Sequence, residues 1–590
     1  MTPVAFAGCF GWLHTPVATG RPGTGGGVAV LICPGIAYDA LLSHASLRLL
    51  ADDLAEAGYP TLRFDYPGTA DSCDEAVERA GGHWGAWRQG VDEAADWLKA
   101  TTGARRLVLC GLRGGGMLAT LAAAERGDVA GLVLLAPVLR GQSYMRQLQV
   151  EAQIRTGREA TPTEGLVYRE FDFNPATVAA ISAVDLRTVG PKAGQKAVIY
   201  SQAESRLTSE CAEAWKAAGA DVQTCGWEDM EPLLRHHIVD ETSLADFSNL
   251  VYWLRQAVPQ TGQGMSISVP PAELRPPGCI ETPLRFGNQD RLFGMLCRPV
   301  GKMSETVVII GNGGRDPHYG AARHAVAFAR RLAREGIASL RMDFAGLGDS
   351  IGPPGQERVL THMLGLDRSA DISAAIDMLE RQGFRRFAME GLCAGAYHAF
   401  HGALADPRLS VLLLINLPMF TLPDAGALEY LTWREMSPTV FLRKLPRLGS
   451  WISLLQRRRD LGTILRVQSD RVRRQIVNRL RGIAVRLGLA PKPSFAQAAL
   501  ASLSARGVRT LFVFSRGDAE LDAFRQEFSE PDRELVAYPG AARRIVQEID
   551  HDLTLVAGRE IVETVMIDFL EARDIPSGKG PVYRPRAVLA

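Results

Sequence analysis

Short runs of valine, isoleucine and leucine alternate along the chain with longer segments in which apolar residues recur at helical spacing. This alternation is typical of β–α–β units, whose mainly parallel sheet is covered by helices on both faces. The predicted strands of the first half are Val28–Cys33, Thr61–Phe64, Leu107–Cys110, Gly131–Leu135 and Ala197–Tyr200. Those of the second half are Val307–Ile310, Ala338–Arg341, Phe387–Glu390, Ser410–Ile415 and Thr510–Phe514. We therefore expect an α/β fold.

Blocks of sequence in the first half return in the same order in the second. Leu62–Ser72 and Leu340–Ser350 are identical at six of eleven positions. The other matched pairs are Phe10–Pro16 with Phe293–Pro299, Val28–Gly35 with Val307–Gly314, and Gly111–Gly115 with Gly391–Gly395. Because the offset between counterparts stays at about 280 residues, the chain carries a duplicated domain.

Composition suggests where the two domains meet. The stretch Val258–Gly287 is rich in proline and glycine and marks the join. We expect one mainly parallel, doubly wound α/β domain at residues 1–260, a linker at 261–285, a second such domain at 286–575 and a loose tail at 576–590. A chain of 590 residues is too long for a single core, which agrees with two domains.

Composition and charge exclude several classes of protein. Charged residues make up 22% and hydrophobic residues 46% of the chain, as in ordinary globular proteins, and the net charge of +1 argues against a general nucleic-acid binder. The nine cysteines include no CxxC pair, which argues against zinc and disulfide frameworks, and we expect no metal and no cofactor. No apolar run has the length of a membrane span, so we expect a cytoplasmic protein, with peripheral membrane contact left open.

The segment Gly391-Leu392-Cys393-Ala394-Gly395 carries the clearest chemical signal. It follows an apolar run and opens a segment rich in alanine, which is the strand–turn–helix context of the nucleophile elbow G-x-S-x-G. Cys393 stands where serine usually does. The flanking glycines suit a strained turn, and a helix N-terminus favours a thiolate. The alternative is a strand-to-helix turn that holds a structural cysteine.

These landmarks resemble the α/β-hydrolase superfamily, and the resemblance covers both halves. Within the superfamily, the chain resembles a fusion of the two hydrolases associated with exosortase gene clusters. The opening Gly11-Trp12-Leu13-His14 and the elbow Gly111-Leu112-Arg113 are similar to one of them, and Gly391-Leu392-Cys393 to the other. The resemblance implies a role directed at esters or thioesters in exopolysaccharide or secondary metabolism.

In α/β hydrolases the catalytic residues follow the chain order nucleophile, acid, histidine. Asp518 follows the predicted strand Thr510–Phe514, and His551 precedes a terminal amphipathic helix, so both stand in the required order after Cys393. We expect His551 to take the thiol proton and Asp518 to orient His551. Asp550 and Asp552, which flank the histidine, leave open which carboxylate does so.

Backbone N–H groups complete this predicted site. We expect oxyanion donors at Ala394 and in the turn around Gly313 and Gly314. We expect Asp343 and Asp349 to brace loops rather than to act in catalysis.

The first half lacks a nucleophile at the matching position. Arg113 stands there, and a guanidinium cannot attack a carbonyl. Glu204 and His236 or His237 hold roughly the places of the acid and the histidine. Arg113 at a helix N-terminus is suited to bind a carboxylate or phosphate, or else to pair internally with Glu204 or Asp65. We interpret this half as catalytically degenerate.

A predicted helical cap at about residues 418–500 interrupts the second half. From Arg434 to Arg486 it holds thirteen arginines and one lysine against three acidic residues. This positive charge has two interpretations. It belongs to a solvated helical face, or it forms a docking surface for an acyl carrier protein, the phosphates of CoA or an anionic membrane.

Two hypotheses of function follow. The first is an acyl hydrolase or acyltransferase that uses Cys393, His551 and Asp518 and passes through an acyl-thioester on the enzyme. Such an intermediate is nearly isoenergetic with the thioesters of CoA or acyl carrier proteins, so transfer competes with hydrolysis. The second is a non-catalytic tandem scaffold that binds a carrier protein or a partner in an exopolysaccharide or natural-product pathway.

Overall fold

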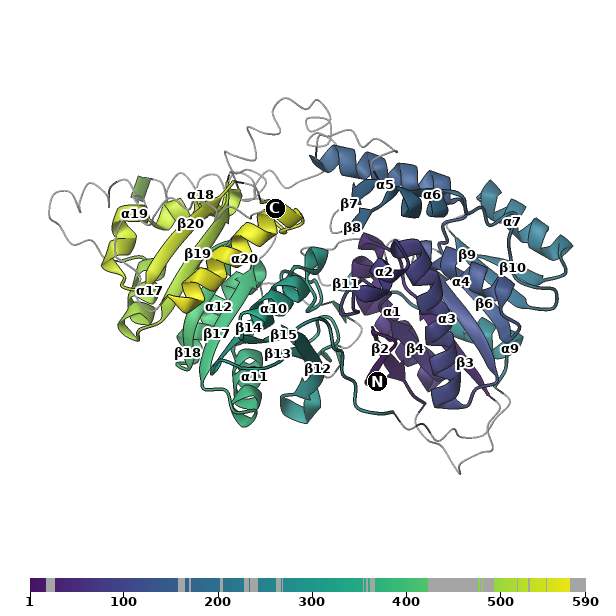
Figure 1. Cartoon of the computed structure of the whole chain (residues 1–590), viewed down its shortest axis with the longest axis horizontal. Coiled ribbons are helices and arrows are strands. Elements are labelled where there is room, and N and C mark those ends of the chain that lie inside the picture. Colours follow the sequence, from purple (N-terminus) through teal and green to yellow (C-terminus); the bar gives the residue numbers. More distant parts are fainter. Residues whose placement is uncertain are drawn as a thin grey trace.

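A computed structural model gives the fold of the chain (Figure 1). The structure describes residues 1–16, 27–156, 165–168, 171–201, 205–227, 233, 242–260, 267, 269–353, 355–356, 359–360, 367–422, 476–477, 480, 493–516, 518–528, 531–547 and 549–572. The predicted cap thus lies largely, and the predicted tail wholly, outside the described residues.

The first half is built around an eight-stranded sheet. Its strands are β1 (Thr2–Phe6), β2 (Cys9–His14), β3 (Val28–Cys33), β4 (Thr61–Phe64), β5 (Arg106–Leu112), β6 (Val129–Leu135), β9 (Lys196–Ser201) and β10 (Asp221–Gly226). They lie in the order β1-β2-β4-β3-β5-β6-β9-β10. β2 pairs antiparallel with β1 and β4, and the pairs from β4 through to β10 are parallel.

The second half repeats this sheet strand for strand. Its strands are β12 (Cys279–Phe286), β13 (Leu292–Pro299), β14 (Thr306–Ile310), β15 (Ala338–Asp343), β17 (Arg386–Leu392), β18 (Leu409–Ile415), β19 (Arg509–Ser515) and β20 (Ala541–Val546). They lie in the order β12-β13-β15-β14-β17-β18-β19-β20. The chain therefore has an α/β-hydrolase fold in each of two tandem halves, which confirms the predicted fold class.

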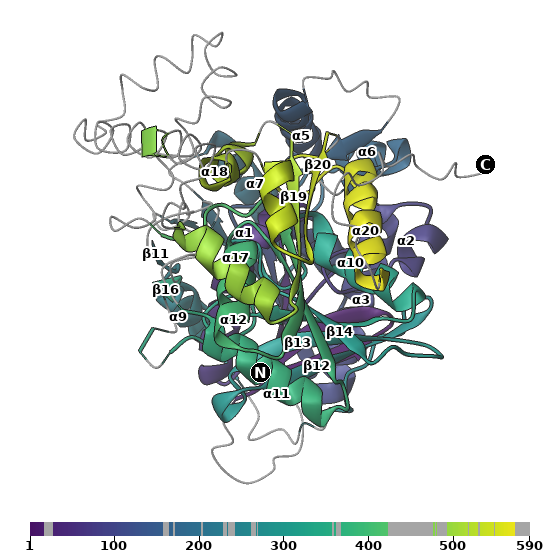
Figure 2. The ribbon, with the colours of Figure 1, turned by 90° about the vertical axis from the view of Figure 1, so that its left-hand side faces the viewer.

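Helices cover both faces of the two sheets (Figures 1 and 2). In the first half they are α1 (Tyr38–Glu56), α2 (Glu75–Arg79), α3 (His83–Thr102), α4 (Gly114–Glu125), α5 (Gly141–Thr156), α6 (Pro175–Ser182), α7 (Arg206–Ala217) and α9 (Ser248–Ala257). In the second they are α10 (His324–Arg334), α11 (Ser369–Arg381), α12 (Ala394–Ala405), α17 (Phe495–Ala505), α18 (Ala519–Glu527), α19 (Pro531–Glu534) and α20 (Val556–Glu571). No helix in the described part of the chain is long and apolar enough to cross a membrane.

The central strands are mostly apolar because both of their faces are covered. All six residues of β3 are buried, as are all but the first residue of β5 and of β17. All ten strands predicted from apolar runs are present, with bounds that differ by at most a few residues.

The predicted linker at 261–285 differs from the structure. β12 lies almost entirely within it and is the first strand of the second sheet. β12 is partly exposed at five of its eight positions and includes Glu281, Thr282 and Arg285, so it lacks the continuous apolar run that identified the central strands.

The two halves contact each other through matched positions of the repeat. The ring of Phe10 stacks on its own counterpart Phe293, with centroids 6.3 Å apart. β11 (Thr242–Ser243) also pairs with β16 (Val359–Leu360), and so joins the halves a second time. A contact between counterparts is the mark of a pseudo-two-fold interface, in which the same surface of each half faces the other.

Candidate active site

Cys393 lies at the sharp turn between β17 and α12. Its backbone adopts φ 53° and ψ −114°, which side chains other than glycine rarely adopt. A Cβ on Gly391 would lie 2.2 Å from the backbone of Gly395, and a Cβ on Gly395 would lie 2.6 Å from the carbonyl oxygen of Asn312. Both glycines are therefore required, and together they hold Cys393 at the N-terminus of α12.

The thiol of Cys393 is within hydrogen-bonding reach of the imidazole ring of His551. His551 Nδ1 lies 2.7 Å from Asp518 Oδ2, which leaves Nε2 for the thiol. A second carboxylate, Glu520 Oε2, lies 3.7 Å from the same Nδ1. The structure thus brings together the cysteine, the histidine and the acid that the sequence singles out.

Charge around His551 favours its protonated form. Burial alone would lower the pKa of His551, but Glu520, Cys393 and Asp518 outweigh it and raise the pKa well above its ordinary value. An imidazolium beside Cys393 is the partner that a thiolate requires.

The carboxylates on either side of His551 have other contacts. Asp550 Oδ1 accepts a hydrogen bond of 2.7 Å from the backbone N–H of Thr554, and its other oxygen accepts from the Thr554 hydroxyl. Within the described part of the chain, no hydrogen bond or ion pair joins Asp552 to the ring. Asp518 is therefore the carboxylate that orients the histidine.

Asn416, which the sequence analysis missed, joins the loops that carry Asp518 and His551. It lies directly after β18, is fully buried and adopts φ 48°. Its Nδ2 donates to the carbonyl oxygen of His551 at 3.0 Å and to the hydroxyl of Ser515 at 3.0 Å, and its Oδ1 accepts from the Ser515 N–H at 2.8 Å. The sequence does carry a signal for Asn416, because it is a polar residue at the end of an otherwise apolar run.

The predicted oxyanion donors lie beside the elbow. Ala394 is the first residue of α12, where backbone N–H groups have no partner within the helix. A Cβ on Gly313 would lie 3.5 Å from the side chain of Leu392, so the Gly313–Gly314 turn lies against the residue that precedes Cys393. Both predicted donor segments therefore lie next to the elbow residues that flank Cys393.

The first half has the same elbow with a different side chain. Arg113 adopts φ 49° and ψ −119° at the N-terminus of α4, as Cys393 does at α12. Its Nε lies 3.4 Å from Asp39 Oδ2, and its guanidinium lies 6.0 Å from the centre of the Tyr144 ring. The expected pairing with Asp65 is wrong, because α1 brings Asp39 to the elbow instead. Glu204, His236 and His237 lie outside the described residues.

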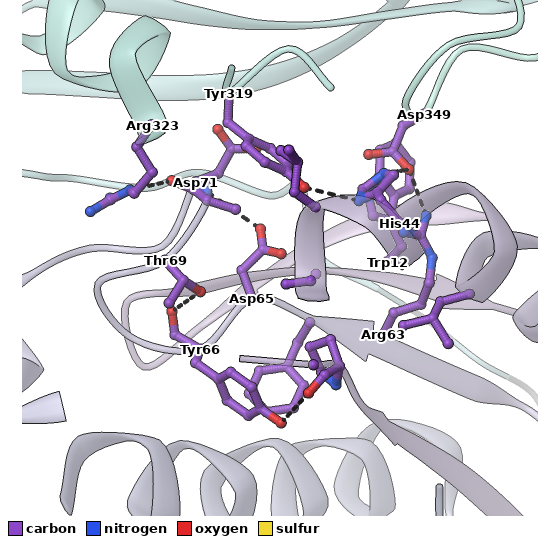
Figure 3. A pocket seen from close by; sticks show the side chains of 18 of the residues that line it. Trp12, His44, Arg63, Asp65, Tyr66, Thr69, Asp71, Tyr319, Arg323 and Asp349 are labelled. Carbon is purple, nitrogen blue, oxygen red and sulfur yellow. Dashed lines mark hydrogen bonds and ion pairs between the residues drawn. The ribbon is translucent and has the colours of Figure 1, made fainter. Parts of the chain in front are cut away.

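A cavity of about 60 Å³ lies between the two halves (Figure 3). Figure 3 shows His44, Arg63 and Asp349 on one side of it, Asp71 and Arg323 on the other, and Asp65 between them. Burial, together with the nearby charges of Asp71 and Asp349, raises the pKa of Asp65 to about 8. The cavity belongs to the interface, since its lining does not include Arg113 or Cys393.

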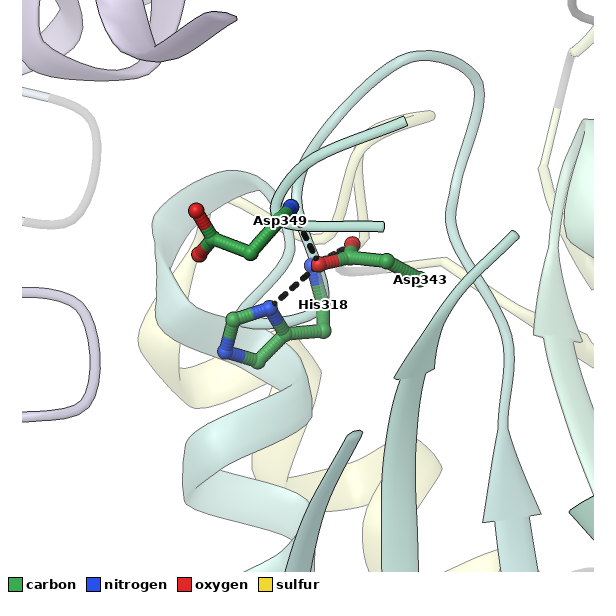
Figure 4. Close-up of side chains that lie close together, drawn as sticks. All are labelled: His318, Asp343 and Asp349. Atoms are coloured by element: carbon green, nitrogen blue, oxygen red, sulfur yellow. Dashed lines mark hydrogen bonds and ion pairs between the residues drawn. The ribbon is translucent and has the colours of Figure 1, made fainter. Parts of the chain in front are cut away.

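Two groups in the described part of the chain have the residue types of a metal site: His318 with Asp343 and Asp349 (Figure 4), and His551 with Asp518 and Glu520. Both ring nitrogens of His318 contact carboxylates, Asp343 at 2.8 Å and Asp71 at 2.6 Å. A histidine with a carboxylate at each ring nitrogen is protonated, so its own positive charge balances the carboxylates in the place where a metal ion would otherwise do so. The second group lies beside Cys393, and its shortest contact is the one of 2.7 Å between His551 Nδ1 and Asp518 Oδ2.

One family model matches part of the first half. Residues 28–182 match the family described as serine aminopeptidase, S33. This range covers β3 to α6 of the first half, where Arg113 stands at the elbow, and neither elbow of the chain carries the serine of that description. No curated protein matches the chain.

Many solved structures are similar to one half of the chain. Examples are the esterase Pf2001 of Pyrococcus furiosus (14% identity, 49% of this chain and 91% of that one, TM-score 0.31) and Est1E of Butyrivibrio proteoclasticus (12%, 49% and 99%, 0.29). A third is the α/β hydrolase GrgF of a Penicillium species (15%, 49% and 97%, 0.30).

Proposed function

We propose that this chain, which has the α/β-hydrolase fold in two tandem halves, is an acyl hydrolase or acyltransferase that uses Cys393 as a covalent nucleophile. The observation that carries the proposal is the contact of the Cys393 thiol with His551, whose other nitrogen lies 2.7 Å from Asp518. A nucleophile, a base and a group that orients the base are the parts of an acyl-transfer site.

In the proposed reaction, His551 Nε2 already holds the proton of the thiol, and the sulfur attacks the carbonyl carbon of an ester or thioester as the anion of this pair. The N–H of Ala394 and those of the Gly313–Gly314 turn stabilise the oxyanion that forms. When the carbonyl is restored, the bond to the leaving oxygen or sulfur breaks, and His551 returns the proton to that atom. Asp518 holds the ring and stabilises its positive charge throughout.

The second step decides between hydrolysis and transfer. Water, an alcohol, an amine or a second thiol attacks the acyl-Cys393 thioester, His551 accepts the proton of the attacking group, and Cys393 is regenerated. The donor that we propose is an acyl thioester of CoA or of an acyl carrier protein, because the arginines between residues 434 and 486 complement phosphates and acidic helices.

The competing function is a non-catalytic scaffold. It is favoured by the first half, where Arg113 takes the nucleophile position and pairs with Asp39. If the second half had also lost its chemistry, the chain would bind a carrier or partner without forming a covalent intermediate.

Intact-protein mass spectrometry separates the two functions. We would incubate the full chain with acyl thioesters from acetyl to long-chain and expect a mass increase of one acyl group. The adduct should be lost in Cys393→Ala and kept in Cys110→Ala, which removes a buried cysteine of β5 in the first half. An adduct that survives Cys393→Ala, or the lack of any adduct in the unmodified protein, would reject the proposal.

A further inference from the structure

The two halves differ in the loop that connects the first parallel strand to the next helix. In the first half this loop is Pro34–Ala37, between β3 and α1. In the second half it is Gly311–Arg323, between β14 and α10, and it is much longer. The longer loop begins at the Gly313–Gly314 turn beside Cys393, and its later residues contact the first half.

Side chains of this loop bind the first half closely. His318 Nε2 lies 2.6 Å from Asp71 Oδ2, and both side chains are 1% exposed. Arg323 donates to the carbonyl oxygens of Ala70, Gly68 and Ser72 at 2.8, 3.0 and 2.8 Å and to Asp74 at 2.7 Å. Every one of these acceptors lies in the segment between β4 and α2 of the first half.

The backbone where the loop enters α10 is strained. Ala322 and Arg323 adopt φ 55° and 53°, which non-glycine residues rarely adopt and which persist only where surrounding contacts hold them. For Arg323 those contacts come mainly from the first half. For Ala322, Arg559 of α20 donates to the carbonyl oxygen at 2.6 Å.

The same loop is tied to the elbow at its other end. Asp343 accepts hydrogen bonds from His318 N and Asn312 Nδ2, both at 2.7 Å, and lies 2.8 Å from His318 Nδ1 (Figure 4). Asn312 in turn accepts from the Phe344 N–H at 2.7 Å, and its own carbonyl group lies against Gly395. A continuous set of buried contacts therefore runs from Asp71 through His318, Asp343 and Asn312 to the Gly313–Gly314 turn.

We propose that the first half positions the oxyanion loop of the second, and that Asp71 is a positioning residue for the reaction at Cys393. The degenerate half would thus be part of the working enzyme although its own elbow carries Arg113. Asp71 does not touch Cys393: one of its carboxylate oxygens contacts His318, through which it reaches the loop, and the other faces Arg341. The expected effect of Asp71 on the rate of acylation rests on the proposed function. The contact between Asp71 and the loop does not depend on that function.

The test compares two reactions of Cys393 in the full chain. Acylation by p-nitrophenyl acetate needs the oxyanion donors, whereas alkylation of the thiol by iodoacetamide does not. In Asp71→Asn we expect kcat for acylation to fall about ten-fold or more with little change in KM, since loss of one oxyanion donor costs about 10²–10³ in kcat. The rate of alkylation should stay within about two-fold. Asp71→Glu, which keeps the charge, should recover part of the loss.

Asp128→Asn is the matched control. It makes the same chemical change in the first half, where Asp128 pairs with Lys99 and Arg126 away from the second half. We expect no change in either rate. The inference is overturned if acylation is unchanged in Asp71→Asn, if acylation and alkylation fall together, or if Asp128→Asn reproduces the effect.

Hydrogen exchange provides a readout independent of catalysis. In Asp71→Asn the amides of residues 312–323 should exchange at least ten-fold faster, while those of β17 and β18 keep their protection. If the unmodified protein forms no acyl-enzyme but this difference is present, the proposed function fails and the link between the halves stands. If exchange is unchanged, the link fails. Should Asp71→Asn not fold, Arg323→Gln, at the more exposed rim of the same contact, takes its place with the same expected outcomes.

Discussion

Arg63 Nη2 in the first half lies 2.6 Å from Asp349 Oδ1 in the second, and their counterparts in the repeat form the reciprocal pair: Arg341 Nη2 lies 3.0 Å from Asp71 Oδ1. All four side chains are at most 8% exposed. A surface that pairs with its own copy in this way is what a symmetric dimer uses. The duplication thus placed in one chain an interface with the symmetry of a dimer.

The Arg63–Asp349 pair should matter far more for stability than an ion pair at the surface. Asp349→Asn removes the charge that faces both Arg63 and His44, and leaving a buried charge unpaired costs about 3–5 kcal/mol. Glu125→Gln removes the partner of Arg88 in an exposed pair and should cost less than about 1 kcal/mol. Urea unfolding of both variants checks this. Equal losses in the free energy of unfolding would show that the interface pair contributes no more than the exposed pair.

The interface also predicts how the protein responds to acid. Burial tends to raise the pKa of Asp71, but His318 and Arg341 hold it at about 2. A carboxyl whose pKa is lowered by folding contributes stability above its unfolded value near 4, and this contribution is lost as pH falls toward 2. The melting temperature should therefore fall between about pH 4 and pH 2, and more steeply than in Asp71→Asn. If the melting temperatures of the two proteins fell in parallel with pH, the lowered pKa of Asp71 would be contradicted.

The sequence predicted the interior of each sheet and much of the site. The central strands were recognisable because burial on both faces favours a continuous apolar run, as in β3. Cys393, Asp518 and His551 were found because each follows a recognisable strand or precedes a helix at the place that the elbow motif implies.

What the sequence did not reveal depends on contacts between distant segments. The edge strand β12 was taken for a linker because only part of it is buried. Asp39 was not identified as the partner of Arg113, because the first turn of α1 meets the elbow only in the folded sheet. For Asp349 the sequence predicts a role in bracing a loop, and no local pattern could show that it pairs with Arg63, 286 residues away in sequence.

Glu390 should destabilise the protein at neutral pH. It is 1% exposed within β17, no hydrogen-bond donor in the described part of the chain reaches its carboxyl group, and burial raises its pKa to about 8. Because the pKa of Glu390 is higher in the folded state than the unfolded value near 4.3, its ionisation costs more free energy in the folded state. The free energy of unfolding is therefore highest below about pH 4.3 and falls as pH rises toward 8. The loss is on the order of 3 kcal/mol at pH 7.

Glu390→Met should therefore stabilise the protein, and the gain should grow between about pH 5 and pH 8. The counterpart of Glu390 in the first half is Cys110, so the matching position of that sheet carries an uncharged side chain. Glu563→Met is the contrasting control, because Glu563 is buried but pairs with Arg331, and its loss should destabilise. Denaturant titrations across this pH range test both, and a gain that does not depend on pH would contradict the raised pKa.

Replacement of the nucleophile by serine should change the pH profile of acylation. The raised pKa of His551 keeps the ring protonated well above pH 6.5. A protonated ring beside the sulfur stabilises the sulfur anion, so the unmodified protein should acylate at neutral pH. Cys393→Ser instead needs the neutral ring to take its proton, and its acylation should rise only at more alkaline pH. Stopped-flow acylation by p-nitrophenyl acetate from pH 5 to 10 measures both, and coincident profiles would argue against the ion pair.

The last prediction concerns the basic segment between residues 434 and 486, which lies almost wholly outside the described residues. If it recruits an acidic acyl donor, charge reversal at Arg457, Arg458 and Arg459 should raise KM for acyl-CoA and leave kcat nearly unchanged, because only binding common to the ground and transition states is lost. Added salt should have the same effect on the unmodified protein, since exposed charges are screened over about 8 Å at physiological ionic strength.

A small neutral thioester is the internal control for this prediction. Its reaction with Cys393 should ignore both the charge reversal and the salt, because it offers nothing for the arginines to bind. If both substrates slow equally, the segment supports the structure of the site rather than the capture of a donor. If neither substrate changes, the arginines form a solvated face, and specificity for the acyl donor must come from residues nearer to Cys393.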